Sequence, residues 1–459
     1  MRPILMATEY GRLLQSCSDD ELRSMAGVVA GAAWNMIERH NTRKVVFLCE
    51  DILWRLGRLS GEYLKQGGWE ISIALLSRDT LPVLLDNVLI CDMLFTPMAD
   101  ESLSRKRMDW IEAMTASPCP IFSVAIPAGV DPDSGRAAES AVKAEITVAP
   151  GAYLSGLFLH DGLDHSGEIR PVGRETISGE GLYRFEDADA KRLLPPRKRT
   201  AHKGDSGKVL LCVGSPKYVG AALLSARACL AAGCGILYVA CPDVVRTALW
   251  RLPEAIGIPV GNDWDAASCE TAISSLTGMR AAGIGCGVGR GDISLLIENT
   301  LRSGLPLVLD ADGLNCLSRH PELYPLLHER VILTPHPREM SRLTGMPSEE
   351  LLEDPIASAQ KYARRWGCTV LLKGAATAVS DGRRTRIVAE GNAGLGKGGS
   401  GDVLTGIITG LLAQGVEPFD AACLGSYLLG ISALEAFELL RERMLRATNV
   451  VEALEYGNE

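Results

Sequence analysis

Short apolar runs alternate with amphipathic stretches along the first part of this chain. The clearest apolar run, residues 44–49 (KVVFLC), predicts a buried strand, and residues 19–39 before it predict a helix. The same pattern predicts four further strands, at residues 70–76, 88–92, 120–126 and 145–149. Because helical stretches lie between several of these strands, the pattern predicts a parallel, doubly wound α/β sheet.

A second pattern of the same kind begins at Lys208. It predicts seven strands, at residues 208–213, 236–241, 256–260, 281–285, 306–310, 331–334 and 369–373. A hairpin follows, with strands predicted at 377–380 and 385–389 around the turn Asp381-Gly382. Two predicted helices, at 402–414 and 421–439, complete this part of the chain.

The stretch between the two patterns has the composition of a domain junction. Residues 173–181 are rich in glycine, serine and glutamate, and residues 194–199 (LPPRKR) are rich in proline and charge. Such stretches connect separately folded domains. We therefore predict a boundary near residue 185, and a chain of 459 residues is too long for one ordinary hydrophobic core.

Composition and charge exclude several classes of protein. Apolar residues make up 47% of the chain and there are 48 glycines, which suits layered α/β domains. A net charge of −9 argues against a nucleic-acid partner. The 13 cysteines form no C-x-x-C pair, so we expect reduced thiols and neither disulfides nor a metal site. Residues 1–10 lack a signal-peptide pattern and no apolar run reaches membrane-spanning length, so we expect a cytoplasmic protein with no membrane partner.

The strongest candidate for chemistry is the glycine-rich segment 391–402 (GNAGLGKGGSGD), which leads directly into an apolar helix. Glycines let backbone N–H groups approach an anion closely, and a helix N-terminus adds free N–H groups and a positive dipole. Asp402 would place a carboxylate beside this anion hole, where it could accept a proton from an attacking hydroxyl. The alternative is that Asp402 only caps the helix and the glycines form a flexible loop. Six glycines in twelve residues favour the anion site.

The Gly-x-Gly-Asp sequence before a long helix resembles the signature of the ribokinase-like superfamily. Further segments resemble the NAD(P)H-hydrate dehydratase family, in that family's order, and span roughly residues 195–440. These segments are 201–214 (AHKGDSGKVLLCVG), 220–226 (GAALLSA), 283–289 (GIGCGVG), 307–315 (LVLDADGLN), 333–339 (LTPHPRE) and 371–374 (LLKG). The Thr-Pro-His-Pro sequence within 333–339 separates this family from the sugar and vitamin kinases of the same fold.

The resemblance implies an enzyme that removes water from hydrated NADH or NADPH, with ADP as co-substrate and Mg²⁺ as cofactor. AMP and phosphate would be the other products, and Asp402 would be the catalytic carboxylate. The positions that would contact the hydrated cofactor are Ala221, Gly287, His336 and Asp402. The positions that would contact ADP are Lys373, Gly374, Ala375, Ala376, Thr377, Asn392, Ala393, Gly394, Leu395, Gly396, Lys397, Gly398, Gly399, Ser400 and Gly401.

Several of these residues also have a purely structural interpretation. Lys373 could be an exposed residue at a strand end, and His336 could serve only the local structure. Gly287 could belong to an ordinary turn between a strand and a helix. Asp310 and Asp312 follow a predicted strand and could help to hold Mg²⁺, although Asp312 is better placed to cap the next helix.

The first part of the chain resembles the NAD(P)H-hydrate epimerase that is often fused to this dehydratase. Residues 125–135 (AIPAGVDPDSG) resemble the epimerase Asp-x-Pro-Ser-Gly segment, but the catalytic aspartate falls on Ala125 and a potassium-binding serine falls on Ala128. Residues 49–55 (CEDILWR) replace the epimerase glycine-rich phosphate loop. We interpret Glu50 and Asp51 as ordinary acids at a strand end. The departures predict a domain without epimerase activity.

The expected architecture is α/β with two domains. Residues 1–185 would form an N-terminal Rossmann-like three-layer αβα domain, and residues 186–459 a C-terminal ribokinase-like three-layer αβα domain. We expect a homo-oligomer. Two other functions remain open for the sequence, a small-molecule kinase on the same fold and a nucleotide-binding sensor without catalysis.

Overall fold

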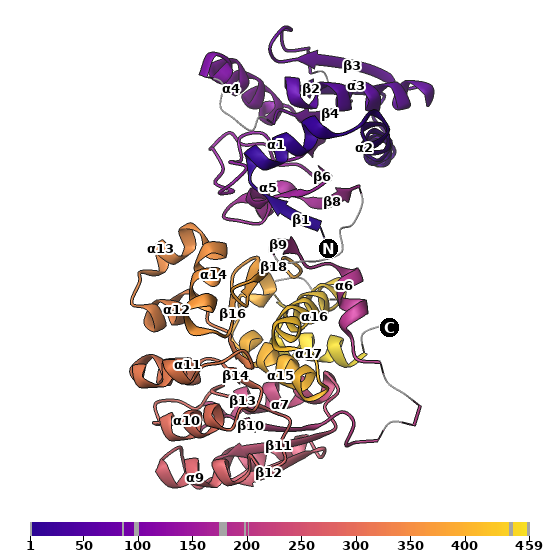
Figure 1. Ribbon diagram of the computed structural model, residues 1–459. Coiled ribbons are helices and arrows are strands. Elements are labelled where there is room, and N and C mark those ends of the chain that lie inside the picture. Colours follow the sequence, from indigo (N-terminus) through magenta and orange to yellow (C-terminus); the bar gives the residue numbers. More distant parts are fainter. Residues whose placement is uncertain are drawn as a thin grey trace. The chain divides into compact units, whose positions relative to one another are not determined.

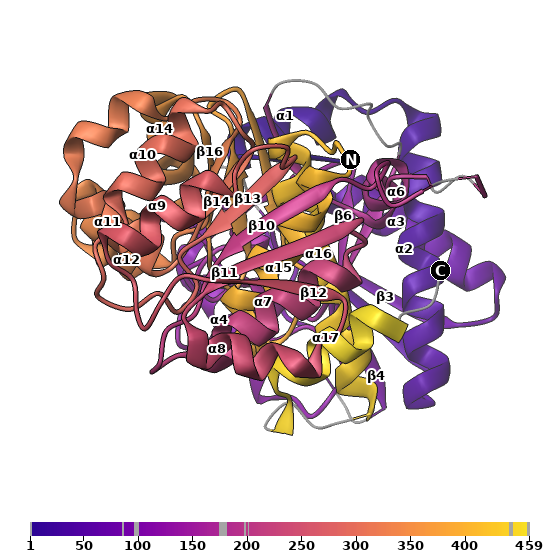
Figure 2. The ribbon, with the colours of Figure 1, turned by 90° about the horizontal axis from the view of Figure 1, so that it is seen from below.

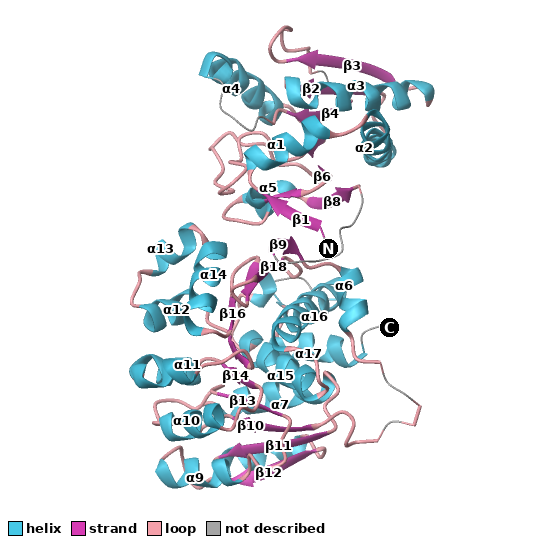
Figure 3. Cartoon of the chain, in the orientation of Figure 1, coloured by secondary structure: helices cyan, strands magenta, loops and turns pink. Residues whose placement is uncertain are grey.

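The structure is a computed structural model that describes residues 2–84, 87–95, 101–173, 181–196, 199–200, 202–439 and 444–456. Most of the predicted junction, residues 174–180 and 197–198, lies outside these ranges, as does Ala201. The chain divides into two compact units. One comprises Met1–Ser178 with Leu182–Arg184, and the other comprises Gly179–Gly181 with Phe185–Glu459. Figure 3 shows that each unit combines helices with strands.

The first unit contains a six-stranded parallel sheet in the order β3-β2-β4-β5-β6-β8. Its strands are β2 (Lys44–Cys49), β3 (Glu70–Leu75), β4 (Val88–Met93), β5 (Ile121–Val124), β6 (Ile146–Pro150) and β8 (Glu168–Val172). The five strands predicted here are confirmed, with ends shifted by at most two residues. The prediction missed β8, which contains Arg170 and Pro171 and lies at the sheet edge, where proline is tolerated.

Helices cover both faces of this sheet. They are α1 (Ala7–Ser16), α2 (Asp19–His40), α3 (Asp51–Gln66), α4 (Glu101–Ala116), α5 (Gly162–Ser166) and the 3₁₀ turn η1 (Ser155–Leu157). Val46 and Leu48 share a hydrophobic cluster with Trp110 of α4. Since side chains alternate along a strand, Val45 and Phe47 face the opposite layer, which contains α2 and α3. The unit is therefore a three-layer αβα domain.

Three further short strands lie apart from the six-stranded sheet and were not predicted. The strand β1 (Arg2–Leu5) pairs in parallel with β7 (Tyr153–Leu154) and antiparallel with β9 (Gly181–Arg184). Their segments are only two to four residues long, which is too short for a recognisable apolar alternation.

The second unit contains nine strands in the order β12-β11-β10-β13-β14-β15-β16-β17-β18. They are β10 (Lys208–Cys212), β11 (Ile236–Cys241), β12 (Ala255–Pro259), β13 (Ala281–Ile284), β14 (Leu307–Leu309), β15 (Val331–Leu333), β16 (Thr369–Leu372), β17 (Thr377–Ser380) and β18 (Arg384–Val388). The strands from β12 to β16 are parallel, and β17 and β18 form the predicted hairpin. All nine strand predictions are confirmed.

The strand order reverses between β10 and β13. The chain runs outward from β10 through β11 to β12, and then returns to place β13 on the other side of β10. Figure 2 shows these parallel strands side by side. In open α/β sheets, ligands bind at such a switch point, beyond the carboxyl ends of the strands. The segments that follow β10 and β13 are therefore placed to form a ligand site.

Helices cover both faces of this sheet too, as Figure 1 shows. One layer contains α6 (Asp187–Leu193), α7 (Val219–Ala231), α8 (Asp243–Ala248), η2 (Leu249–Arg251), α15 (Ser400–Ala413), α16 (Pro418–Leu439) and α17 (Ala447–Tyr456). The other contains α9 (Ala266–Ser274), α10 (Ser294–Arg302), α11 (Asp312–Arg319), η3 (Pro321–Leu326), α12 (Pro337–Thr344), α13 (Ser348–Glu353) and α14 (Pro355–Trp366). Within the described ranges, no helix combines the length and apolar character needed to span a bilayer.

The helix α15 packs unusually closely against α7. A Cβ added to Gly406 would lie 2.2 Å from the backbone oxygen of Ser225. Glycine is therefore required at this crossing, and it lets two backbones approach each other. The close crossing holds α15, and with it the glycine-rich segment at its N-terminus, firmly against the sheet.

Candidate functional site

The glycine-rich segment ends in the first turn of α15. Gly399, with a φ angle of 103°, is the N-cap, and Ser400 is the first residue of the helix. Asp402 is thus the third helical residue and does not cap α15, which removes the structural alternative considered for it. Its carboxylate lies where the free N–H groups and the positive end of the helix dipole are found.

Asp402 has the environment of a catalytic base. Burial raises the pKa of its carboxyl group to about 6, and the neighbouring Asp310 carboxylate acts in the same direction. A hydrogen bond from Cys286 and the charge of Lys373 oppose that rise. A carboxylate with this pKa is ionised at neutral pH yet more basic than an exposed aspartate, which suits proton abstraction.

A buried ion pair stands beside Asp402. The Asp310 carboxylate, 2% exposed, accepts hydrogen bonds from Lys373 Nζ at 2.6 Å and from Thr405 Oγ1 at 2.8 Å. Burial works against the charge of Lys373, but the carboxylates of Asp310 and Glu339 raise its pKa overall, so it stays protonated. The alternative that Lys373 is an exposed strand end is wrong. A Cβ on Gly401 would lie 3.3 Å from Lys373 Nζ, so the ammonium group reaches the start of α15.

Two polar side chains of the candidate ADP-binding loop, Asn392 and Lys397, bind the protein itself. Asn392 Oδ1 accepts from the Gly394 N–H at 2.9 Å, and its Nδ2 donates to the Ala433 carbonyl at 3.0 Å. Lys397 Nζ donates to the Leu445 carbonyl at 2.7 Å. These bonds shape the loop, and they leave its glycine amides as the groups suited to an anion. Residues 374–376 connect β16 to β17 directly after Lys373.

The structure brings Gly287 and Ala221 into contact. Gly287 has a φ of 66°, and a Cβ there would lie 2.7 Å from Ala221 Cβ and 2.8 Å from Tyr218 Cβ. The turn after β13 thus packs against the first turn of α7, at the switch point of the sheet. Gly287 is therefore required by both its backbone conformation and its neighbours.

The substitution Gly287→Ala tests this packing. We expect a loss of about 1 to 3 kcal/mol in the free energy of unfolding, because a left-handed alanine is strained and its Cβ would overlap Ala221. The control is Gly278→Ala, since Gly278 also has a positive φ, 80°, but nothing lies within 4 Å of an added Cβ. Urea unfolding of both variants measures the effect, and equal losses would show that the contact contributes nothing.

His336 has a structural role as the N-cap of α12. Its Nδ1 accepts hydrogen bonds from the backbone N–H groups of Arg338, at 3.1 Å, and Glu339, at 3.4 Å. Burial lowers the pKa of the imidazole, with help from the charge of Lys373. The ring is therefore neutral with its proton on Nε2, which lies 3.3 Å from the Glu339 carboxylate. The side chain is 44% exposed, so a ligand can reach it.

A cavity of about 640 Å³ lies at the switch point, where four basic residues line it: Lys217, Arg290, Arg319 and Arg342. Ser215, only 4% exposed, also lines it, and its hydroxyl has no hydrogen-bond partner within the described structure.

Asp312, another residue that lines this cavity, accepts a hydrogen bond from the Gly289 N–H at 2.7 Å. The prediction that Asp312 caps α11 is wrong, because Ala311 occupies the cap position. Sequence reasoning did not single out the basic residues, since exposed charges at scattered positions carry no local signal.

Comparison with known proteins places this geometry in a family. Residues 209–455 match the profile described as NAD(P)H-hydrate dehydratase. The chain belongs to the NAD(P)H-hydrate dehydratase family. A bifunctional NAD(P)H-hydrate repair enzyme of Moorella thermoacetica is 34% identical in an alignment 353 positions long, which covers 73% of this chain and 66% of that enzyme. Another, of Vibrio cholerae, is 33% identical over 74% of this chain and 68% of its own length. The chain thus spans about two thirds of the length of these relatives.

Solved structures agree with this family assignment. The ADP/ATP-dependent NAD(P)H-hydrate dehydratase of Bacillus subtilis, crystallised with ATP and Mg²⁺, matches 58% of this chain and 94% of its own, with 28% identity and a TM-score of 0.51. A ribokinase-like protein of Enterococcus faecalis matches with a TM-score of 0.54 and 23% identity, covering 62% of this chain and 97% of its own, which shows the shared fold. The predicted ribokinase-like architecture is confirmed.

The first unit matches a second family profile, described as YjeF-related protein N-terminus, over residues 60–156. No glycine loop follows β2, because α3 begins at Asp51 and only Glu50 lies between them. Glu50 directly follows β2, where it is 7% exposed and forms an ion pair with Arg107. Ala125 keeps an unusual φ of 74°, and the Ala128 N–H donates to the buried Asp92 carboxylate at 2.7 Å.

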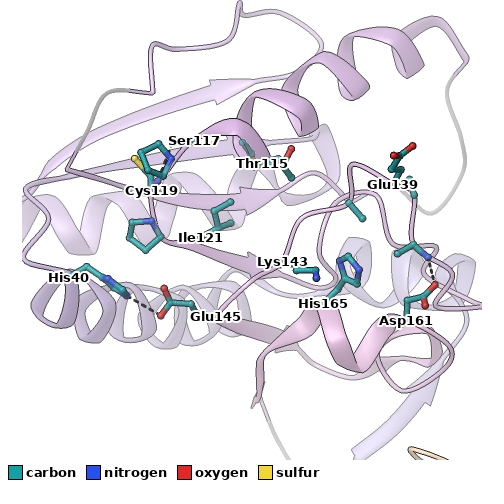
Figure 4. Close-up of a pocket in the computed structure, with 16 residues that line it drawn as sticks. His40, Thr115, Ser117, Cys119, Ile121, Glu139, Lys143, Glu145, Asp161 and His165 are labelled. Atoms are coloured by element: carbon teal, nitrogen blue, oxygen red, sulfur yellow. Dashed lines mark hydrogen bonds and ion pairs between the residues drawn. The ribbon is translucent and has the colours of Figure 1, made fainter.

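A cavity of about 660 Å³ in the first unit lies at the amino ends of the sheet strands, opposite the carboxyl ends where Ala125 follows β5. Its lining includes Ile121 and Glu145, at the amino ends of β5 and β6. Figure 4 shows His40 and Glu145 pointing toward each other, with His40 Nε2 3.0 Å from Glu145 Oε2. Ligands of open α/β sheets bind beyond the carboxyl ends of the strands, so this cavity does not correspond to an epimerase site.

Proposed function

We propose that this protein dehydrates the S isomers of hydrated NADH and NADPH, with ADP as the phosphoryl donor, and returns NADH or NADPH, AMP and phosphate. The position and environment of Asp402 carry the proposal. Its carboxylate stands in the first turn of α15, beside the glycine loop and the Asp310–Lys373 pair. The names of the relatives, NAD(P)H-hydrate repair enzymes and a dehydratase, support the choice of substrate.

The reaction would proceed in two steps. Asp402 takes the proton of the ring hydroxyl, whose oxygen forms a bond to the β-phosphorus of ADP while the bond to the AMP oxygen breaks. The glycine amides and Lys373 stabilise the charge that develops on the transferred phosphoryl group. The carbon–oxygen bond of the phosphorylated ring then breaks, phosphate leaves, and loss of a proton from the adjacent ring carbon restores the double bond.

The basic cavity is suited to the phosphates of the hydrated cofactor. Gly287 connects it to Ala221, and Asp312 both lines the cavity and acts on the pKa of Asp402. The unpartnered Ser215 hydroxyl and the arginine side chains offer donors for a pyrophosphate. The reacting ring would thus lie near Asp402 while the rest of the dinucleotide extends along the switch point.

Arg342→Gln tests this placement of the substrate. Arg342 is held by a hydrogen bond from its Nη1 to Asn315 Oδ1 at 2.7 Å, so it is already oriented at the cavity. Loss of a charged hydrogen bond predicts a KM for the hydrated cofactor about tenfold higher, with little change in kcat. Arg338→Gln, on the same helix but outside the cavity lining, should leave KM unchanged. Steady-state kinetics measure KM and kcat of both variants, and an equal KM in the two would contradict this placement of the substrate.

Mg²⁺ would enter with the nucleotide. Both oxygens of Asp310 are engaged, one with Lys373 and the other with Thr405. Mg²⁺ commonly keeps several waters and binds through substrate phosphates and one or two carboxylates. Asp312, whose charge acts on the pKa of Asp402, is the neighbouring carboxylate that would take part, and the ion would screen the negative charge of ADP during phosphoryl transfer.

The assay that tests the function mixes the full chain with ADP, Mg²⁺ and the two isomers of hydrated NADH. We expect the near-ultraviolet absorbance of NADH to return from the S isomer alone, since the first unit retains neither a glycine loop nor an acid at position 125. Recovery of both isomers, faster than their spontaneous exchange, would show that the first unit is an epimerase. No recovery with ADP or ATP would refute the dehydratase and leave the kinase or the sensor.

The pH dependence of the reaction follows from the raised pKa of Asp402. The base must be ionised, so kcat/KM should fall about tenfold per pH unit below a pH of about 6 and level off above it. A profile of kcat/KM from about two pH units below that pKa to about two units above it measures the effect. A midpoint near the ordinary aspartate value would contradict the desolvated environment of Asp402.

A further inference from the structure

Three side chains of different chemical types meet beside the cavity of the second unit. They are Asp292, in the segment before α10, Cys316 of α11 and His320, which follows α11. One potential ligand atom of each lies within 4.8 Å of the others. Among the described residues this is the single group of three or more such side chains with that spacing. A thiol, an imidazole and a carboxylate form a ligand set typical of zinc.

The two distances from Asp292 match those between ligands of a tetrahedral ion. Asp292 Oδ1 lies 3.6 Å from Cys316 Sγ and 3.5 Å from His320 Nε2. Bond lengths of about 2.3 Å to sulfur and about 2.0 to 2.1 Å to nitrogen or oxygen place tetrahedral ligands about 3.3 to 3.6 Å apart. Both distances from Asp292 Oδ1 therefore fit one shared cation, and Cys316 Sγ and His320 Nε2, which lie within 4.8 Å of each other, would close on the ion when it binds.

The histidine is oriented as a metal ligand. Its Nδ1 lies 2.9 Å from Glu322 Oε1, a carboxylate that can only accept a hydrogen bond when ionised. The proton of a neutral ring therefore resides on Nδ1, and the lone pair of Nε2 points to Asp292. A carboxylate that fixes the tautomer of a histidine from behind is a common second layer of zinc sites.

We propose that Asp292, Cys316 and His320 form a zinc site, with the cysteine bound as a thiolate and a fourth position open to water. Burial raises the pKa of free Cys316 to about 11, and a bound cation would displace the thiol proton. The Asp292 side chain is 64% exposed and that of His320 is 26% exposed, so an ion can enter from solvent.

The site would join two segments that form the basic cavity. Asp292 follows Arg290 in the segment after β13, and Cys316 lies on α11 between Asp312 and Arg319. A shared cation would fix the spacing of these segments, as a hydrogen bond from Gly289 to Asp312 already does at the start of α11. Zinc binding would thus stabilise the second unit and does not depend on the proposed catalysis.

Titration with Co²⁺ tests the site in the reduced, chelator-treated full chain without nucleotide. We expect one equivalent of Co²⁺ to produce a thiolate charge-transfer band in the near ultraviolet, which one equivalent of Zn²⁺ then removes. Cys316→Ser should abolish the band, whereas Cys17→Ser, at the one cysteine that is not buried, should retain it. Glu322→Ala should weaken binding about tenfold.

Two results would overturn the proposal. One is the absence of a thiolate band with stoichiometric Co²⁺, and the other is a band that persists in Cys316→Ser. If Cys316→Ser does not fold, as circular dichroism would show, Asp292→Asn replaces it, because this exposed substitution removes a ligand without a change in the core. Activity is not a readout of this experiment, so its failure and a failure of the dehydratase proposal are distinguishable.

Discussion

Asp402→Asn should lower kcat/KM about 10² to 10⁴-fold, because the variant retains the shape of the site but has no base to take the hydroxyl proton. The glycine loop, Lys373 and Asp310 remain in place, so the affinity for ADP should change little. Kinetics and nucleotide binding by calorimetry measure the two effects separately. A variant with unchanged kcat/KM would exclude Asp402 as the base.

The same substitution should stabilise the protein at neutral pH. Burial raises the pKa of folded Asp402 to about 6, above the value of about 3.9 in an unfolded chain. The folded state therefore holds the proton more tightly, and it loses stability as pH rises from about 4 to about 6. Above this range the folded protein carries the full cost of burying an ionised carboxylate. Asparagine has no charge, so the variant should gain about 1 to 3 kcal/mol in the free energy of unfolding.

Urea unfolding of the full chain at pH 5 and pH 8, about one unit below and two units above the pKa of Asp402, measures this gain. The gain should be larger at the higher pH, where the carboxylate is ionised. The control is Asp243→Asn, at an exposed aspartate that begins α8, which should alter neither activity nor stability appreciably. A less stable Asp402→Asn would mean that the ionised carboxylate stabilises the fold.

Lys373→Met should have the largest effect on stability. It leaves the buried Asp310 carboxylate, bonded to Lys373 at 2.6 Å, without its cation. Removal of one partner of a buried pair costs about 3 to 5 kcal/mol. Activity should fall as well, since the ammonium group reaches the start of α15, where the phosphoryl charge would develop.

The double variant Asp310→Asn/Lys373→Met distinguishes the lost pair from lost packing. It removes both charges, so most of the stability should return while activity stays low. Lys191→Met is a matched control, because Lys191 also pairs with an aspartate, Asp187, but both side chains are exposed. The free energy of unfolding of Lys191→Met should fall by less than about 1 kcal/mol. If the double variant is no more stable than Lys373→Met, the unpaired charge of Asp310 is not the cause of the stability loss in Lys373→Met.

The sequence by itself determined the longer strands of both units and the position of the glycine-rich segment before α15. Buried parallel strands are continuous apolar runs, so 208–213 and 331–334 could be recognised without any knowledge of their neighbours. The segment 391–402 could be recognised for the same reason, because an anion site made of backbone amides and a helix start is local in sequence.

Only the tertiary structure decided how side chains from different strands combine. Asp310 meets Lys373, 63 residues later, and Thr405, 95 residues later, because β14, β15 and β16 are neighbours and α15 packs against β14. Three other features arise in the same way: the Glu50–Arg107 pair of the first unit, the basic cavity, and the group of Asp292, Cys316 and His320. Such sites depend on sheet order and close packing, and neither leaves a periodic signal along the chain.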